Sequence, residues 1–351
     1  MKILGIETSC DDTAAAVIEA KGGLKKPCFS VLSNVSYSQV AIHKKFGGIV
    51  PNLASRAHLQ KITPTVKAAL LISEIRRISE IDLIAVTRGP GLAPSLLVGI
   101  NFARALAYRF RKPIIGVNHI EGHIFSNWLL GEKVNFPALI LVVSGGHTEL
   151  VLMSAKGGSA SGGKDSMGYQ IVGQTLDDAA GECFDKSARI LGLGFPGGPA
   201  IAAEAKKFKI ENLKLKISLP RPMVNSNNYN FSFSGLKTAV LYSYKGKNKS
   251  AMAYEIQEAI IDVLIAKTLK AVKNFQPKTV MIAGGVAANK KLREYLVKKI
   301  APYEIPLLIP NLAYTTDNAA MIAAAGYFNY LKKKPRENSW KNIKMDANLK
   351  L

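Results

Sequence analysis

The chain opens with two short apolar runs separated by a polar turn. Residues 2–8 (KILGIET) and 13–19 (TAAAVIE) have the apolar content and spacing of two paired strands. Residues 138–144 (ALILVVS) and 148–153 (TELVLM) repeat this design about 136 residues later, around a glycine turn. The recurrence predicts two structurally related lobes with a cleft between them.

Strand-like runs alternate with helical stretches along the rest of the chain. Residues 81–91 (IDLIAVTRGPG) precede a helical run from about Ser95, and residues 112–119 (KPIIGVNH) precede a helix that carries two histidines. Residues 279–289 (TVMIAGGVAAN) lead into a helix from about Lys290. Strands that alternate with helices predict an α/β architecture.

Two segments lack apolar periodicity, and one long helix stands out. Residues 154–168 are rich in glycine, serine and lysine, which predicts a flexible loop on the second lobe. Residues 331–351 are basic with few periodic apolar positions, which predicts a loosely ordered tail. We expect a long helix from about Ala253 to Asn274.

The overall composition fits a globular cytoplasmic protein. Hydrophobic residues make up 48% of the chain, and no run reaches the roughly 18 apolar residues that a membrane span needs. The N-terminus runs straight into strand-like sequence, without a signal or transit segment. Three cysteines far apart make a disulfide framework improbable and indicate a reducing cytoplasm.

The charge indicates a polyanionic partner. Lysine and arginine number 47 against 25 acidic residues, a formal net charge of +22. Such an excess costs self-repulsion, which binding to nucleic acid would relieve. The alternative is a lysine-rich composition without a functional cause.

Three glycine-rich turns could hold a phosphate or a flat ligand. The turns at 144–146 (SGG) and 283–285 (AGG) expose successive backbone N–H groups at strand ends, and residues 191–201 (LGLGFPGGPAI) let backbone approach a purine. Each alone is more often a tight turn. Together they favour a nucleotide-like ligand, although neither a P-loop nor a GxGxxG after a strand is present.

The stretch NHIEGH suggests a metal site. His119 and His123 lie four residues apart, about 40° from each other on a helix, so both can bind one ion. Glu121 lies roughly 200° round from His119, the wrong register for the H-E-x-x-H pattern of zinc proteases. The best third ligand is Asp317 in YTTDNAAM, for which the alternative is an ordinary helix cap.

Ten motifs then occur in the order of a known family, from residue 3 to about 325. They are GIETSCDDTA, FGGIVPNLASRAH, GPGL…LLVG, NHIEGH, VSGGHTEL, LDDAAGECFDK, LGLGFPGGP, FSFSGLKTA, AGGVAAN and TTDNAAM. The chain resembles the TsaD family of bacterial tRNA N6-adenosine threonylcarbamoyltransferases, formerly named sialoglycoprotein endopeptidases.

The resemblance implies a two-lobed, α/β, actin-like ATPase (ASKHA) fold with a central nucleotide cleft. The expected domains are an N-terminal lobe at 1–135, a C-terminal lobe at 136–330 and a basic tail at 331–351, with the last helix, about 317–330, able to pack back on the first lobe. The implied reaction transfers threonylcarbamoyl from threonylcarbamoyl-AMP to the N6 amine of adenosine 37 in tRNAs that read codons beginning with A, and releases AMP.

The resemblance also implies site residues and partners. His119, His123 and Asp317 would bind one divalent metal, iron or zinc. The implied substrate-binding positions are Val142, Val143, Ser144, Gly145, Gly146, Asp185, Gly198 and Asn289. Asp11 or Asp12 could relay the amine proton. The implied partners are tRNA, a TsaB-like paralogue that pairs through the first lobe and a TsaE-like ATPase, with no membrane.

The sequence departs from the family at a few positions. Asn118 stands where relatives often carry a histidine, Asp12 replaces a usual glutamate, and Asn52 and Ala57 replace common acidic residues. Three other functions compete with the transferase: a metalloprotease, an ATPase or sugar kinase of the same fold, and an inert RNA-binding scaffold. The position of Glu121 relative to the two histidines argues against the metalloprotease. The ATPase or sugar kinase would require ATP as phosphoryl donor.

Overall fold

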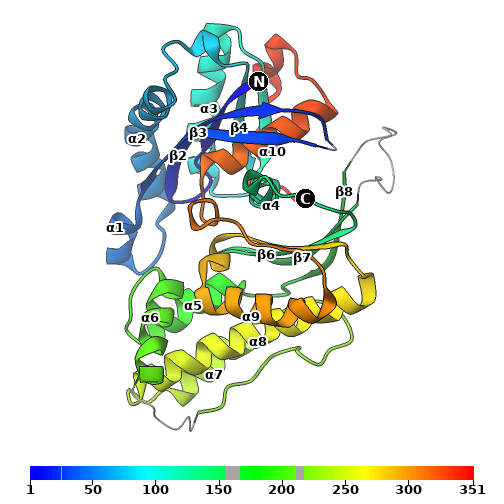
Figure 1. Ribbon diagram of the computed structural model, residues 1–351. Helices are drawn as coiled ribbons and strands as arrows, with labels where there is room; N and C mark the ends of the chain where they lie inside the picture. The colour runs from blue at the N-terminus through cyan, green and yellow to red at the C-terminus, as the bar shows by residue number, and fades with distance from the viewer. Residues whose placement is uncertain (25, 155–166, 211–216) are drawn as a thin grey trace. The chain divides into compact units, whose positions relative to one another are not determined.

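The computed structural model describes residues 1–24, 26–154, 167–210 and 217–351 (Figure 1). The loop expected at 154–168 therefore lies almost wholly outside the described residues. By internal contacts the described chain divides into two compact units. Unit 1 comprises Met1–His43, Ile49–Val134 and Pro310–Leu351, and unit 2 comprises Lys44–Gly48 and Asn135–Ile309.

Each unit contains a five-stranded sheet and its helices. The elements of unit 1 are β1 (Lys2–Glu7), β2 (Asp12–Lys21), β3 (Cys28–Ser38), α1 (Val40–His43), α2 (Pro51–Ile72), β4 (Leu83–Gly89), α3 (Ala93–Phe110), β5 (Ile114–Asn118), α4 (His119–Phe125) and α10 (Ala319–Lys332). The elements of unit 2 are β6 (Ala138–Val143), β7 (Thr148–Ser154), β8 (Gly168–Gln174), α5 (Ala180–Ile190), α6 (Gly197–Ile210), α7 (Ser234–Ser243), α8 (Lys249–Phe275), β9 (Thr279–Ala283), α9 (Lys290–Ile300) and β10 (Leu307–Leu308). Short 3-10 helices are η1 (Lys44–Phe46), η2 (Ile78–Glu80), η3 (Ser126–Leu130), η4 (Gly285–Ala288), η5 (Ala301–Tyr303), η6 (Leu312–Tyr314) and η7 (Glu337–Asn342).

The two sheets have the same topology. Their orders are β3-β2-β1-β4-β5 and β8-β7-β6-β9-β10. In each, an antiparallel hairpin is extended by a third antiparallel strand on one side and by two parallel strands on the other. The predicted repeat is confirmed, and the α/β, actin-like fold implied by the resemblance is confirmed with it.

The longest helix begins earlier than the sequence predicts. We expected it from Ala253, but α8 starts at Lys249, after Asn248 in a left-handed conformation. The prediction was late because Lys249 and Ser250 carry no apolar signal, whereas Ala251 and Met252 are already buried. None of the helices in the described part of the chain is long and apolar enough to cross a membrane.

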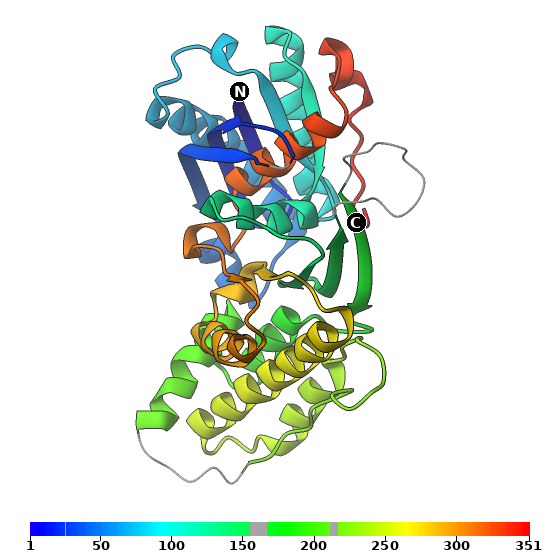
Figure 2. The same ribbon diagram turned by 45° about the vertical axis from the view of Figure 1, so that its right-hand side comes forward.

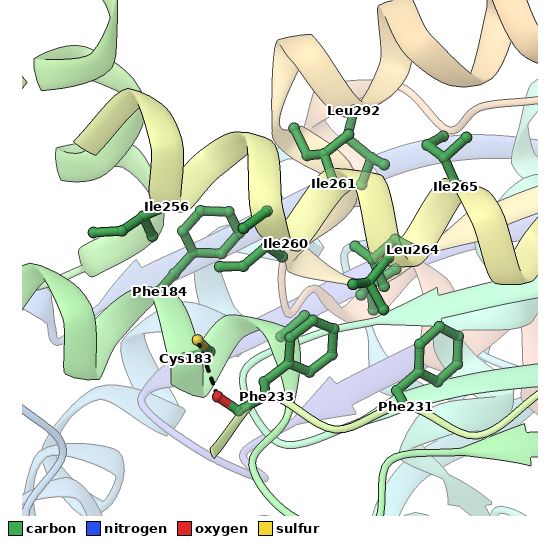
Figure 3. Close-up of a cluster of buried hydrophobic side chains, with 14 of the residues drawn as sticks. Cys183, Phe184, Phe231, Phe233, Ile256, Ile260, Ile261, Leu264, Ile265 and Leu292 are labelled. Atoms are coloured by element: carbon green, nitrogen blue, oxygen red, sulfur yellow. Dashed lines mark hydrogen bonds between the residues drawn. The ribbon is translucent and has the colours of Figure 1, made fainter. Parts of the chain in front are cut away.

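In unit 2, α8 forms the centre of the core. Ile256, Ile260 and Leu264 of this helix are fully buried and pack with Phe184 of α5 and with Phe233 (Figure 3). The thiol of Cys183 lies in the same cluster, 3.7 Å from the carbonyl oxygen of Phe233. This core fixes the helices that follow the glycine turns of the second sheet.

In unit 1, helices cover both faces of the sheet. Helices α2 and α3 lie on one side of this sheet and α10 on the other (Figure 1). Leu4 and Ile6 of β1 belong to the core that α2 and α3 complete, whereas Gly5 faces α10. Burial on both faces explains why β1 and β4 are apolar at nearly every position, since parallel strands covered on both sides show no alternation.

Helix α10 approaches this sheet and α4 closely because glycines lie at the points of contact, two facing α10 and one within it. A Cβ at Gly5 would overlap the carbonyl oxygen of Ala319, and a Cβ at Gly326 would lie 2.5 Å from the Cβ of Ala85. A Cβ at Gly122 of α4 would lie 2.7 Å from a methyl group of Ile322. These three glycines set the distance at which α10, and the residues just before it, lie from β1 and α4.

The C-terminal segment is not the loosely ordered tail that its composition predicts. Trp340, Ile343 and Met345 pack against the core of unit 1, and Trp340 contacts Tyr108 of α3 with ring centroids 5.0 Å apart. Figure 2 shows this red segment beside α3. The prediction was wrong because three apolar residues at irregular spacing anchor an otherwise basic stretch.

We expect Gly5→Ala to destabilise unit 1 by about 1–3 kcal/mol, because the added methyl group must displace backbone of α10. Both tryptophans, Trp128 and Trp340, lie in unit 1, so tryptophan fluorescence during urea unfolding reports this unit. Gly23→Ala is the matched control, since no atom lies within 4 Å of its added Cβ. Equal midpoints for the two variants would contradict the close packing.

Candidate functional site

Two histidines and one carboxylate meet at the end of the first sheet. His119 and His123 lie on α4, directly after β5, and their Nε2 atoms are 3.4 and 3.3 Å from Oδ1 of Asp317. Ligand atoms of all three residues lie within 4.8 Å of one another. Spacings of this size match the edges of a tetrahedron around a metal with bonds of about 2.0–2.1 Å.

Asparagine residues cap the N-termini of α4 and α10, so the side chains of His119, His123 and Asp317 remain available to bind a metal. The side chain of Asn118 accepts hydrogen bonds from the backbone N–H groups of Ile120 and Glu121, so α4 begins at His119. The side chain of Asn318 caps α10 by accepting from the N–H of Met321, at 3.0 Å. Asp317 is therefore not the helix cap that the sequence left as an alternative.

Glu7 holds the far side of His119 and was not identified from the sequence. This fully buried carboxylate lies at the end of β1, with Oε2 3.0 Å from Nδ1 of His119. It also accepts hydrogen bonds from the hydroxyl of Thr87, at 2.6 Å, and from the backbone N–H of Ser9. With Nδ1 bonded to Glu7, Nε2 of His119 faces Asp317 as a potential metal ligand. The available signal was a glutamate directly after the apolar run of residues 3–6.

Burial and charge set the protonation of the cluster. Burial opposes a charge on His119, but the carboxylates of Asp317 and Glu7 raise its pKa well above the usual range. Burial lowers the pKa of His123. For Asp317, burial acts against ionisation, yet His119 and His123 hold its pKa below the usual range. The site thus combines an ionised carboxylate with a neutral imidazole.

His123 supplies the test of whether a metal fits. Its Nδ1 makes no hydrogen bond to any residue that the structure describes, and its Nε2 lies 3.3 Å from Oδ1 of Asp317 without hydrogen-bond geometry, although the side chain is fully buried. A buried nitrogen that lacks a well-formed hydrogen bond is costly, and coordination of an ion between Nε2 and the Asp317 carboxylate would compensate for it. Two imidazoles and a carboxylate suit zinc or iron. The cluster can hold a metal.

Glu121 points away from the cluster, as its register predicted. Its carboxylate accepts a hydrogen bond from Asn329 of α10 at 3.1 Å, and lies 3.9 Å from the ammonium of Lys332. It therefore cannot serve as the general base of a zinc protease, which must reach metal-bound water.

Asp11 lies in the turn between β1 and β2, and Asp12 is the first residue of β2. His58 braces this turn: its Nε2 lies 3.0 Å from the carbonyl oxygen of Cys10 and its Nδ1 2.8 Å from the hydroxyl of Thr13. Burial, with the charges of Asp317 and Asp11, raises the pKa of Asp12 to about 7. A carboxyl group of this pKa can exchange a proton near neutral pH.

In unit 2, the turn after β6 is open above its two glycines. The turn is closed by the N–H of Ser144, which donates to the carbonyl of His147 at 2.8 Å, and no atom lies within 4 Å of a Cβ added at Gly145 or Gly146. The side chains of Val142 and Val143 are fully buried, so only their backbone could reach a ligand.

Helix N-termini abut this turn because two further glycines permit it. A Cβ at Gly181, in the first turn of α5, would lie 2.5 Å from the carbonyl oxygen of Ser144. Gly284, before η4, has φ of +93°, and a Cβ there would overlap the carbonyl of Val143. The backbone amides at the starts of α5 and η4 therefore lie close to the turn, which is the arrangement of an anion cradle.

The remaining predicted residues have structural bonds of their own. Asp185 accepts from the N–H of Gly197 at 2.6 Å, while space is open beside Gly198. Burial raises the pKa of Asp185. Asn289 caps α9 by accepting from the N–H of Leu292 and donates to Gln257, each at 3.1 Å. Their roles toward a nucleotide stay predictions.

Comparison with known proteins places this geometry in a family. The family model described as tRNA N6-adenosine threonylcarbamoyltransferase matches residues 30–324. A protein of that name from Caldicellulosiruptor saccharolyticus is 47% identical over 95% of this chain and 94% of its own length. Another, from Bacillus subtilis, is 48% identical over 95% of this chain and 91% of its own length.

A solved structure supports the fold independently. HypF of T. kodakarensis superposes on 94% of this chain with a TM-score of 0.58 and 14% identity, and this chain spans about half (47%) of that protein. Identity this low concerns the fold alone. The family model and the two relatives show that the chain belongs to the tRNA N6-adenosine threonylcarbamoyltransferase family.

Proposed function

We propose that this protein transfers a threonylcarbamoyl group from threonylcarbamoyl-AMP to the N6 amine of adenosine 37 in tRNAs that read codons beginning with A. The observation that carries the proposal is the convergence of His119, His123 and Asp317 in a chain that matches the family over nearly its full length. In the reaction, the amine nitrogen forms a bond to the carbamoyl carbon, the bond from that carbon to the phosphate oxygen breaks, and AMP leaves.

His119, His123 and Asp317 would hold one divalent metal, iron or zinc. Such an ion supplies a positive charge that can bind the threonyl part of the donor or polarise its carbonyl. Glu7 orients the ring of His119, and the capped start of α4 orients both histidines. These supports matter because small misplacements of reacting groups cost large factors in rate.

The adenine amine must lose one proton during the transfer. Asp12, the first residue of β2, is the residue we assign to accept it, with Asp11 directly before it in the chain. The support is the pKa of Asp12 near 7 and its electrostatic coupling to Asp317. Because the donor is a reactive mixed anhydride, a nucleophilic side chain is not required.

The open turn of unit 2 would receive the donor's phosphate and nucleotide. Backbone amides at Gly145 and Gly146 would steady the developing charge on the leaving phosphate. Asp185 and Gly198 would contact the ribose, and Asn289 would contact the nucleotide. The support is the unobstructed space at Gly145, Gly146 and Gly198 and the nearby starts of α5 and η4.

A TsaB-like paralogue would pair with unit 1 through α2 and α3. Leu59 of α2 is 65% exposed and Leu97 of α3 43% exposed. They flank a cavity of about 390 Å³ lined mainly by apolar side chains of both helices. The family resemblance also implies a TsaE-like ATPase that resets the complex. The tRNA substrate and the free cysteines favour a cytoplasmic location for the protein.

Replacement of a metal ligand should abolish the reaction. We expect His119→Ala and Asp317→Ala to lower tRNA modification by at least about 100-fold while tRNA binding is largely kept. Replacement of a residue that only hydrogen-bonds to a metal ligand already lowers metal affinity or activity by about 10–100-fold, and loss of the ligand itself should cost more. Modification is measured by mass analysis of nucleosides after incubation with the donor and partner proteins. Glu121→Gln changes a residue on the same helix that is directed away from the cluster, so this variant should stay active. If Glu121→Gln were inactive and His119→Ala active, the assignment of the metal ligands would be reversed.

Removal of the metal should be reversible. After dialysis against a chelator we expect tRNA modification to be lost, because the ion supplies the charge that the reaction uses. Activity should return with stoichiometric Fe²⁺ or Zn²⁺, because the histidines and the carboxylate keep their positions when the ion is removed. Activity should rise and fall with the metal content of the protein, measured by plasma emission spectroscopy. Full activity in metal-free protein would contradict the role.

Affinity for tRNA should fall steeply with salt. We expect at least about a tenfold loss between about 50 and about 200 mM salt, because contacts of lysine and arginine with phosphates release counterions. Filter binding at several salt concentrations measures the slope. A flat dependence would show that the net charge of +22 reflects composition only.

A further inference from the structure

The last residues of the described chain bond to the end of the first sheet, beside the histidine helix. The N–H of Asp346 donates to the carbonyl of Arg88 at 2.8 Å, and the N–H of Gly91 donates to the carbonyl of Ala347 at 3.1 Å. The side-chain amide of Asn118 donates to the carbonyl of Lys350 at 3.0 Å. These bonds join the segment to the ends of β4 and β5.

Gly89 lets the segment lie this close. A Cβ at Gly89 would overlap the carbonyl oxygen of Asp346 and lie 3.1 Å from the Cβ of Leu349. Its φ of +153° is also one that other residues rarely adopt. The end of β4 is therefore shaped to receive the backbone of residues 346–349.

Asn118 connects this segment directly to the metal ligands. Its Oδ1 accepts from the N–H groups of Ile120 and Glu121 at the start of α4, while its Nδ2 donates to Lys350. The carbonyl of Lys350 can only accept, so it fixes which way the amide of Asn118 faces. In that orientation Oδ1 is directed at the helix that presents His119 and His123.

A second connection runs through the loop after β4. Gly91 bonds to Ala347, and the next residue, Leu92, donates its N–H to the carbonyl of Ser9 at 2.8 Å. The hydroxyl of Ser9 lies 3.2 Å from Nδ1 of His119. The segment thus supports His119 from the helix side and from the Glu7–Ser9 side.

We propose that residues 346–351 are a positioning element of the metal centre: through Asn118 and through the 89–92 loop they hold α4 in the orientation that lets His119 and His123 bind one ion. The proposal rests on the metal site of the proposed function. It concerns a part of the chain beyond residue 324, where the match to the family model ends. It also assigns to Asn118 a role beyond capping α4, because its side-chain amide connects the cap to Lys350.

The test compares Zn²⁺ binding by the full-length chain, a chain that ends at Met345, and the variant Asn118→Asp. The shortened chain keeps Trp340, Ile343 and Met345, which pack in the core. Asn118→Asp keeps an acceptor for the helix N–H groups but loses the donor to Lys350. We expect both to bind Zn²⁺ about tenfold more weakly, the lower end of effects for groups around metal ligands. The two changes combined should cost no more than either alone.

Lys350→Ala is the matched control, because the bond uses the backbone carbonyl and not the ammonium group. It should bind Zn²⁺ like the full-length chain. Hydrogen exchange adds a readout that separates local positioning from global stability: the amides of residues 120–125 should exchange faster in the shortened chain, while those of α8 in unit 2 should not change.

Each result decides between distinct conclusions. If the full-length chain does not bind Zn²⁺ with Nε2 of His119 and His123, the proposed metal centre itself fails and the positioning role with it. If the full-length chain binds and the shortened chain binds equally well, the positioning role is overturned and the metal centre stands. Equal weakening by Lys350→Ala would also overturn it, because it would assign the effect to charge.

Discussion

The close approach of α10 to β1 and α4 is the constraint on which the site depends. Gly5 and Gly122 present no side chain to α10, so Asp317, two residues before this helix, reaches the two histidines of α4. Ala319 and Ala323 of α10 are the residues nearest to a Cβ added at Gly5, so small residues on both elements permit the close approach. A fold that kept every ligand but separated these elements by one methyl group would hold the carboxylate too far from the imidazoles.

Charge then determines what this packing can bind. His119 lies between two carboxylates: that of Glu7 is fully buried, and that of Asp317 is partly buried, with 20% of its side chain exposed. One buried and one partly buried carboxylate that share a single imidazole leave the cluster short of positive charge, which is costly unless a cation compensates it. Glu7 lies against Nδ1 of His119, which leaves Nε2 of His119 directed at Asp317, as Nε2 of His123 is. The electrostatics and the geometry therefore indicate the same position for an ion.

Local patterns predicted much of this, and contacts distant in sequence did not follow from them. The two hairpins and the pair His119–His123 could be predicted because strand and helix periodicities act over a few residues. Glu7 was missed because its partner Thr87 lies 80 residues away. The C-terminal segment was misjudged for the same reason, since its backbone bonds to Arg88 and Asn118 leave no mark on its composition. From its local pattern Asp317 was a candidate third ligand that a helix cap could also explain, and only the family resemblance implied it as a metal ligand; the cap proved to be Asn318.

The most direct test is anomalous diffraction from crystals grown with the metal bound, recorded at the zinc or iron absorption edge. The account predicts one strong peak in each molecule, about 2.0–2.2 Å from Nε2 of His119, Nε2 of His123 and a carboxylate oxygen of Asp317. It predicts that Nδ1 of His119 stays bonded to Glu7. A peak held by other side chains, or fully loaded protein with these three residues turned apart, would contradict it.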